Sequence, residues 1–401
     1  MQAIHVASVG MSATIVRVEA VEIILVLIMA TTKEIAMTDK PSPDRRSHIH
    51  SWIAVIINLL VCGAIGATFG AFGYPFLWLV GGLVLGAVLG LANESLFNRV
   101  RLLARWYKLR TVILVLGEAL LVIYVLIPAY GAYHATHPTR VPVAGSPANL
   151  GMTYELAAIS TADGVTLRGW YVPSRNGAAI IAVHGSDGNR DQLLWHAQTL
   201  AEHGYGVLLF DLRAHGESGG TVFPVTNASR DVKAVVTYLR SRKEVDPERI
   251  GAVGLSLGAH VILQAAAEDT SLKALVSDGA SSNTIEDVLP LPPQYRLMYV
   301  AAPMWWMTDR MSDLMSGVPA EPFIVLVKKI APRPILFISS SQEPEPFMNR
   351  RLYEYAGPTA QLWELPDTGH VGGIFVHPKE YQQRMLSFFD AALFDQKPTV
   401  P

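Results

Sequence analysis

One stretch of this sequence carries no charged residue for 43 positions, from Ser51 to Asn93. A helix of about 20 apolar residues crosses a bilayer core of about 30 Å, so the stretch is long enough for two spans. Pro75, near its middle, suits a turn better than the interior of a helix. A pair of buried soluble helices is the alternative, but such helices normally have a polar face and these have none. We therefore predict membrane spans at 52–71 and 76–92.

A third apolar segment, 111–130, is interrupted only by Glu118 and completes a predicted transmembrane region over 51–131. A carboxylate inside a membrane is costly and is by default a functional candidate. The other two spans offer Glu118 no charged partner, which makes a poor ion pathway. A neutral or snorkelling side chain is therefore favoured, and the role of Glu118 is left open.

The segment between the second and third spans carries five basic residues against the single acid Glu94: Arg99, Arg101, Arg105, Lys108 and Arg110. The positive-inside rule places this segment in the cytoplasm. Three spans then put the chain from residue 131 onward outside the cytoplasm, in a multi-pass protein of the cell membrane. The first 50 residues are expected to be a disordered tail, whose apolar stretch at 23–30 and internal Met37 leave the start codon and the topology open.

The composition excludes some partners. The net charge is −2, so no overall field attracts nucleic acid. The single cysteine, Cys62, cannot form an intramolecular disulfide, and cysteine usage therefore does not reveal the redox compartment. Only 16% of the residues are charged, against about 25% in an ordinary soluble domain, which agrees with an apolar first third.

Beyond a proline-rich linker at 132–150, short apolar strands alternate with helical segments. Strands are predicted at 152–160, 165–172, 179–183, 206–210, 249–253, 274–277, 335–339 and 361–365. Helices are predicted at 191–203, 228–242, 257–268 and 378–393. This alternation predicts an α/β domain over 151–401, with a mostly parallel sheet and helices on both faces.

Ser256 lies in the segment Gly254-Leu255-Ser256-Leu257-Gly258, between a predicted strand and a predicted helix. Glycines two residues on either side of a serine allow a tight turn that exposes the hydroxyl. The match alone is weak, but its position between a strand and a helix makes it strong. We therefore predict that Ser256 is a nucleophile; the alternative is a glycine turn with an idle serine.

A nucleophilic serine needs a general base and an acid that orients the base. His370 follows the last predicted strand and comes after the serine in the chain, as this arrangement requires, and His377 is its rival. The acid is expected in the loop after the seventh predicted strand, where Glu343 is the first choice and Glu345 the second. Asp278, at the end of the preceding strand, is the third.

Acyl transfer also needs two backbone N–H groups that stabilise an oxyanion beside the nucleophile. Leu257, the residue after the serine, is expected to supply one. Ser186, in the loop after the third predicted strand, is expected to supply the other. His184 in the same loop is more often structural, and no further ligands occur at metal spacing, so we expect neither a metal nor another cofactor.

Four motifs together resemble the α/β-hydrolase superfamily, above all its dienelactone hydrolase and prolyl-oligopeptidase branches. They are Asp163-Gly164-Val165, His184-Gly185-Ser186, Asp211-x-Arg213-x-His215-Gly216 and the Ser256 segment. The resemblance covers about 250 residues and implies the α/β-hydrolase fold, with a triad of Ser256, His370 and Glu343. It also implies that Asp211, Arg213 and His215 fix a loop. Two positions depart from the family pattern: the acid loop, usually Gly-x-x-Asp, has Ser340 and Glu343, and Ala214 stands where glycine is usual.

Motifs and resemblance together predict a carboxylesterase-like serine hydrolase that works through an acyl-enzyme. An insertion at about 280–333, rich in Pro, Met and Trp, is expected either to cap an apolar pocket or to pack as ordinary helices. A cap and a membrane tether favour a small-molecule or lipid-like ester with a hydrophobic acyl group, while thioester and amide bonds stay open. The alternatives are a peptidase of the prolyl-oligopeptidase type and a non-catalytic membrane protein that has kept the fold. The oligomeric state is not indicated.

Overall fold

The computed structural model describes residues 107–224 and 228–394. The chain divides into two compact units, Met1–Ile123 and Tyr124–Pro401. The spans predicted at 52–71 and 76–92, and the tail before them, lie outside the described residues. They therefore stay predictions.

The third predicted span falls on a helix. Helix α4 covers Tyr107–Leu121, a π-helical turn covers Val122–Leu126, and α5 covers Ile127–Thr136. Within the described residues, Leu116–Thr136 is the one helix that is long and apolar enough to cross a membrane. The helix continues beyond residue 130 because no further proline interrupts it before Pro138.

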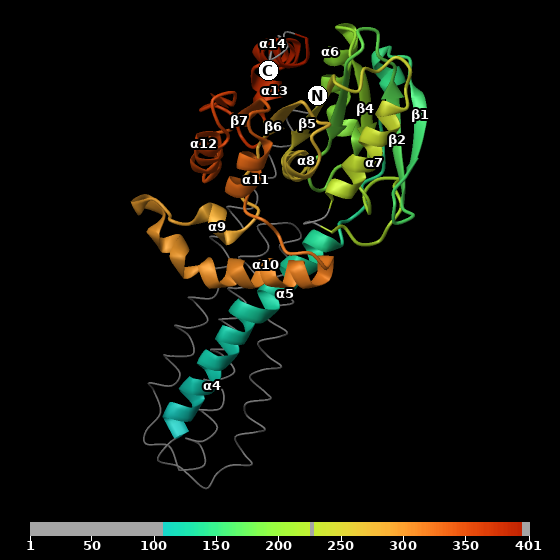
Figure 1. Cartoon of the computed structure of the whole chain (residues 1–401). Coiled ribbons are helices and arrows are strands. Elements are labelled where there is room, and N and C mark those ends of the chain that lie inside the picture. Colours follow the sequence, from blue (N-terminus) through green and yellow to red (C-terminus); the bar gives the residue numbers. More distant parts are fainter. Residues whose placement is uncertain (1–106, 225–227, 395–401) are drawn as a thin grey trace, which may run out of the picture. The chain divides into compact units, whose positions relative to one another are not determined.

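An eight-stranded sheet forms the centre of the second unit, in the order β1-β2-β4-β3-β5-β6-β7-β8 (Figure 1). The strands are β1 (Glu155–Ser160), β2 (Thr166–Val172), β3 (Ala179–Val183), β4 (Gly206–Phe210), β5 (Ile250–Leu255), β6 (Ala274–Asp278), β7 (Ile335–Ser339) and β8 (Gln361–Glu364). β2 pairs antiparallel with β1 and β4, and all the other pairings are parallel. The mostly parallel sheet predicted from the sequence is therefore confirmed.

Helices cover both faces of the sheet and bury its apolar strands. One core cluster packs the sheet against α7 (Ser229–Arg240), α8 (Leu257–Glu268), α11 (Phe323–Ile330) and α12 (Glu345–Tyr355). The other packs the opposite face against α6 (Leu194–Glu202) and α14 (Pro378–Leu393). Strands β3 to β7 are buried along their whole length, which explains their uninterrupted apolar sequences.

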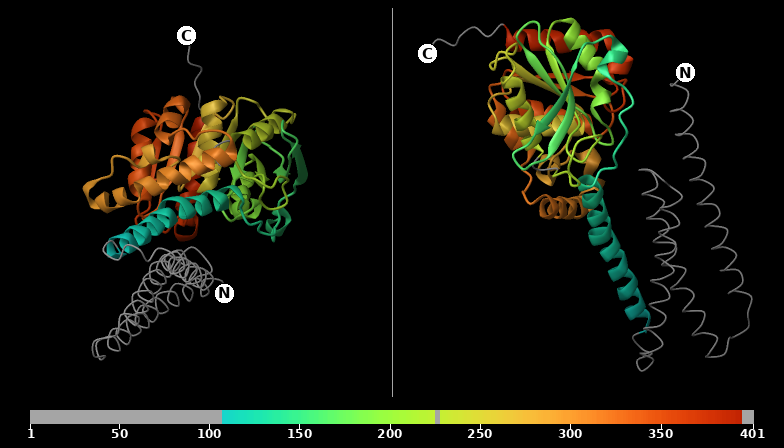
Figure 2. Two further views of the ribbon diagram at one scale, coloured as in Figure 1. Left: turned by 90° about the horizontal axis from the view of Figure 1, so that it is seen from below. Right: turned by 90° about the vertical axis from the view of Figure 1, so that its right-hand side faces the viewer.

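Two helices of the insertion between β6 and β7 differ in their burial. Its helix α11 packs into the main core through an apolar face of Phe323, Leu326, Val327 and Ile330. Its longer helix α10 (Ala302–Ser316) has no buried residue and lies beside α5 (Figure 2). A short helix, α9 (Ile285–Val288), and a 3₁₀ segment (Pro293–Val300) connect β6 to α10. The insertion therefore joins the core through α11, as ordinary helical packing, whereas α10 lies outside the core.

Candidate active site

The register of the parallel strands brings the candidate residues to one edge of the sheet. Val183 pairs with Gly254, Leu255 with Asp278, and Ser339 with Glu364. The carboxyl ends of β3, β5, β6, β7 and β8 thus lie side by side. The loops that leave these ends are the loops from which the sequence predicts the nucleophile, the base, the acid and the oxyanion donors.

Ser256 occupies a strained turn between β5 and α8. Its φ of 51° and ψ of −111° lie where a residue with a side chain is disfavoured, at a cost of about 1–3 kcal/mol. A Cβ added at Gly254 would lie 2.4 Å from the backbone of Gly258, and one at Gly258 would lie 2.1 Å from the carbonyl oxygen of Val183. Because both positions lack room for any side chain, the two glycines allow the turn to form. The Ser256 N–H donates to the carbonyl of Asp278 at 2.8 Å, which fixes the turn against β6.

His370, in the loop after β8, lies against the serine. Its Nε2 is 2.8 Å from the Ser256 Oγ, and its Nδ1 is 2.6 Å from the Oε2 of Glu345. The loop is held in place from β7, because both the N–H and the hydroxyl of Ser341 donate to the carbonyl of Thr368. The hydrogen bond to Glu345 raises the pKa of His370 above its usual value. The structure therefore brings Ser256 and His370 together, as the sequence predicts.

The carboxylate that holds His370 is Glu345, and the first choice, Glu343, is wrong on this geometry. Glu345 begins α12 and is buried, with its Oε1 accepting the Ser340 N–H at 2.6 Å and its Oε2 accepting the Ser340 hydroxyl at 2.9 Å. Glu343 is exposed and accepts the hydroxyl of Tyr295 from the insertion. The start of a helix at Glu345 explains the difference, because it turns Glu345 back onto the end of β7 and leaves Glu343 on the outer side of the loop.

The two other candidates are bound to different partners. His377 contacts Asp367, its Nε2 lying 2.9 Å from both carboxylate oxygens. The carboxyl group of Asp278 accepts the hydroxyl of Tyr381 at 2.8 Å, and burial raises the pKa of Asp278 to about 7. The structure therefore does not bring His377 to Ser256 as the base, or Asp278 to the His370 Nδ1 as the acid.

The loop after β3 lies directly against the nucleophile. A Cβ at Gly185 would lie 3.4 Å from the Cβ of Ser256, and the Gly185 N–H donates to the side-chain Oε1 of Gln192 at 3.0 Å. In the part of the chain that the structure describes, the N–H groups of Ser186 and Leu257 donate to no protein acceptor. They are free to bind an oxyanion, and their use as the oxyanion hole stays a prediction.

His184, in the same loop, has a structural position. It is fully buried, its Nε2 accepts the Leu212 N–H at 3.1 Å, and burial lowers its pKa to about 3. The neutral ring therefore ties the loop after β3 to the chain that leaves β4. Within the described residues, no group of three or more His, Cys, Asp or Glu side chains could hold a metal ion.

The chain after β4 is fixed by buried ion pairs. Asp211 accepts hydrogen bonds from both the N–H and the guanidinium of Arg190, and the guanidinium of Arg213, whose side chain is 5% exposed, binds Asp231. These contacts agree with the loop-fixing role that the resemblance implies. Ala214, which stands where glycine is usual, does adopt a left-handed conformation, with φ of 62°.

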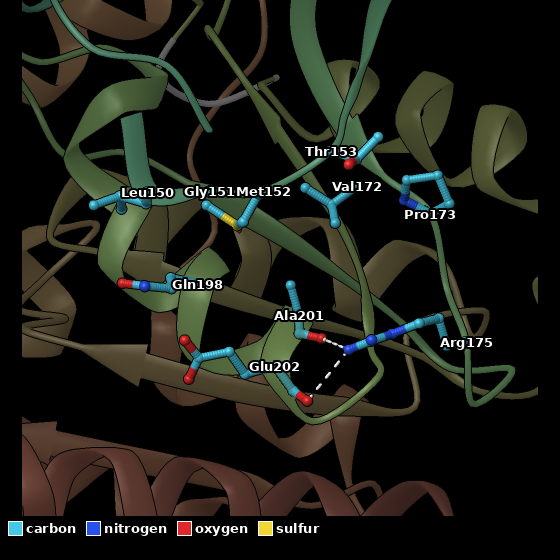
Figure 3. A pocket seen from close by; sticks show the side chains of 10 residues that line it. All are labelled: Leu150, Gly151, Met152, Thr153, Val172, Pro173, Arg175, Gln198, Ala201 and Glu202. Carbon is cyan, nitrogen blue, oxygen red and sulfur yellow. Dashed lines mark hydrogen bonds between the residues drawn. The ribbon is translucent and has the colours of Figure 1, made fainter. Parts of the chain in front are cut away.

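A hollow of about 560 Å³ lies apart from these residues (Figure 3). It is lined by Leu150–Thr153, by the chain after β2 and by the end of α6, where Arg175 donates to the carbonyls of Ala201 and Glu202. Val172, at its rim, pairs with Val207 near the start of β4. This hollow is therefore at the amino end of the parallel strands, opposite the candidate site.

Known proteins match the part of the chain that carries the site. The sequence model of the alpha/beta hydrolase family matches residues 180–383. The uncharacterised protein YfhR of Salmonella typhi is 25% identical over 259 residues, which cover 60% of this chain and 82% of that protein. Thiohydrolase aneE of Aspergillus aculeatus is 32% identical over 130 residues, 31% of this chain and 41% of that protein. Among solved structures, an esterase of Pyrococcus furiosus superposes with a TM-score of 0.54 at 26% identity, covering 65% of this chain and 98% of the esterase.

Proposed function

Because this chain belongs to the alpha/beta hydrolase family, we propose that it is a serine hydrolase whose catalytic residues are Ser256, His370 and Glu345. The observation that carries the proposal is the continuous chain of short hydrogen bonds from the Ser256 Oγ through the His370 ring to Glu345. Nucleophile, base and orienting acid are the three groups that serine hydrolysis requires, and they are joined in the required order.

The proposed reaction follows from the protons in this chain. Glu345 accepts a hydrogen bond from the Nδ1–H of His370, which keeps the proton on Nδ1 and leaves the Nε2 lone pair free to take the proton of Ser256 as its Oγ attacks the acyl carbon. The oxygen that becomes negative is stabilised by the N–H groups of Ser186 and Leu257. His370 then gives its proton to the leaving group, and a water activated in the same way releases the acyl group from Ser256.

An ester with a hydrophobic acyl group is the proposed substrate class. The Pyrococcus furiosus structure bears the name esterase, and the insertion of this chain presents Met and Trp side chains. A thioester is the second candidate, because the Aspergillus aculeatus relative is named a thiohydrolase. Ester and thioester share the acyl-enzyme step and differ in the leaving group, so a panel of matched oxygen and sulfur esters separates them.

We further propose that the chain is anchored in the cell membrane by its first third, with the hydrolase domain outside the cytoplasm. The 43-residue uncharged stretch and the apolar helix Leu116–Thr136 support the anchor. Protease added outside spheroplasts is expected to digest the hydrolase domain. Digestion that occurs only in inside-out vesicles would reverse the proposed orientation.

A fluorophosphonate probe tests the proposed chemistry, since it reacts with an activated serine. The full-length protein is expected to be labelled, and Ser256→Ala is expected to abolish the label. Ser241→Ala, an exposed serine at the end of α7, is the matched control and should be labelled as strongly as the native chain. A folded native protein without label would contradict the proposal, as would a label that survives Ser256→Ala.

A further inference from the structure

Helix α10 carries six Met and Trp side chains, although it lies at the surface of the domain. It contains Met and Trp side chains along its whole length, yet none of its residues is buried. Leu314 is 85% exposed and Trp306 is 49% exposed, while Val300, just before the helix, is 72% exposed. Apolar side chains that gather at this density on a surface mark a contact with another apolar phase or partner.

The position of α10 indicates what that phase is. Thr308 of α10 lies 3.6 Å from the Cβ position of Gly131, and Met315 contacts the hydroxyl of Thr136 at 3.6 Å. Gly131 and Thr136 belong to the last turns of the apolar helix Leu116–Thr136. At about 1.5 Å per residue, they lie about 22–30 Å along that helix, where a bilayer core of about 30 Å gives way to the headgroups.

The exposed aromatic side chains at this level favour lipid over a protein partner. Tyr130 and Tyr133 on α5 are 36% and 51% exposed, and Tyr299 and Trp306 at α10 are 42% and 49% exposed. Tyrosine and tryptophan rings are amphipathic and concentrate at the boundary between the lipid core and water. Figure 2 shows α5 and α10 side by side, so the helix that carries Trp306 lies beside the helix that carries Tyr130 and Tyr133.

We infer that the outer face of α10, formed by Trp306, Arg310 and Leu314 together with Val300 just before the helix, lies in the membrane surface, with the Arg310 guanidinium at the headgroups, and that the enzyme takes its acyl ester from the bilayer. The inference rests on the proposed membrane anchor and serine hydrolase activity. The inner side of α10 connects this surface to the site: Ala302 and Trp305 pack in one cluster with Met348 of α12. Glu345 begins that same helix, so α10 packs on the helix that carries the proposed catalytic carboxylate.

Depth-dependent quenching tests the placement in the full-length protein. Cys62 is the single native cysteine, so a Cys62→Ser chain can carry one new cysteine labelled with an environment-sensitive fluorophore. The label is placed by Leu314→Cys on α10 and, as the matched control, by Leu156→Cys on β1, which is 80% exposed. In phosphatidylcholine proteoliposomes, lipid-borne nitroxide should quench the label at 314 and aqueous iodide should quench the label at 156.

Two outcomes would overturn the placement. A label at 314 that iodide quenches as strongly as the label at 156 means that the face is in water. A label shielded from both quenchers, with cross-linking between chains through position 314, means that a second copy covers the face. Fluorophosphonate labelling of Ser256 is measured on the same samples, so that loss of the active site is distinguished from failure of the lipid contact.

A substrate comparison tests entry from the bilayer. Leu314→Glu is expected to lower hydrolysis of a long-chain acyl ester in the vesicles by about tenfold, as expected when one leucine side chain leaves lipid. Hydrolysis of a short, water-soluble ester should stay within about twofold, and Leu156→Glu should affect neither substrate. If Leu314→Glu lowers both rates equally, or neither, entry from the bilayer is contradicted.

Discussion

Replacing Glu345 by glutamine leaves one acceptor oxygen where the carboxylate has two, and hydrogen-bond donors occupy both oxygens of the carboxylate. Three donors converge on its two oxygens: the Ser340 N–H and hydroxyl at 2.6 and 2.9 Å, and the His370 Nδ1 at 2.6 Å. An amide has one oxygen. If that oxygen stays on the Ser340 N–H, the amide NH₂ faces the His370 Nδ1. The Nδ1 must then give up its proton, which moves to Nε2 and points at the Ser256 Oγ, 2.8 Å away.

A histidine with a proton on Nε2 cannot accept the serine proton, so Glu345→Gln is expected to lower kcat by about 10³–10⁴-fold, which corresponds to about 4–5.5 kcal/mol. Rotating the amide would restore the tautomer, but it would aim the NH₂ at the buried Ser340 N–H and leave that donor unpaired. This alternative costs about 1–3 kcal/mol of stability. The substitution therefore lowers the rate, the stability or both.

The assay is single-turnover acylation by a chromogenic ester, with the melting temperature measured on each variant. Glu343→Gln is the control, because Glu343 is exposed and contacts Tyr295 instead of His370. It should keep kcat within about threefold of the native rate, as exposed residues away from the chemistry usually do. Equal losses in the two variants, or a Glu345→Gln variant with native rate and native stability, would refute the assignment of Glu345.

Three further results are expected. The acid limb of the kcat/KM profile should have its midpoint above pH 6.5, because Glu345 raises the pKa of His370 and only the neutral ring is a base; in Glu345→Gln the midpoint should move to lower pH. Asp278→Asn should raise the melting temperature at pH 8 and change it little near pH 4. Burial raises the pKa of Asp278 to about 7, so the stability this group contributes is full below its unfolded pKa of about 3.9 and is lost as the pH rises through about 7; an equal effect at both pH values would contradict this. Ala214→Gly should stabilise the protein by up to about 1 kcal/mol in urea, since φ of 62° strains alanine and suits glycine; a lower midpoint would count against that strain.

The sheet could be predicted from the sequence because its central strands are covered on both faces. Such strands are continuous apolar runs between turn residues, and β3, β4 and β7 begin and end where the sequence predicts. The sequence gives no equally clear signal for α11 and α12. Prolines precede both helices, and their apolar faces are explained only by the core cluster that they join. Tertiary packing therefore determines where these two helices form.

The site was partly predictable for a similar reason. Ser256 and His370 lie in tight turns at strand ends, where motif and chain order give their positions. The acid depends on whether a helix begins at Glu345, and that helix was missed. An acid followed by a proline is typical of a helix N-terminus, but this pair occurs twice, at Glu343-Pro344 and at Glu345-Pro346, so it indicates a helix start without giving the residue. Nothing in the spacing alone separates Glu343 from Glu345.

The two buried carboxyl groups near His370, those of Asp278 and Glu345, differ in the hydrogen bonds that they accept. Asp278 and Glu345 are both nearly excluded from water. Asp278 has one side-chain donor, the hydroxyl of Tyr381, and its pKa rises to about 7. Glu345 accepts hydrogen bonds from the N–H and the hydroxyl of Ser340 in addition to His370, so three donors hold its two oxygens in place. The serine that replaces the usual glycine in the acid loop therefore supports the displaced acid: Ser340→Gly, which keeps the N–H and removes the hydroxyl, should weaken the orientation of His370 and leave the fold intact.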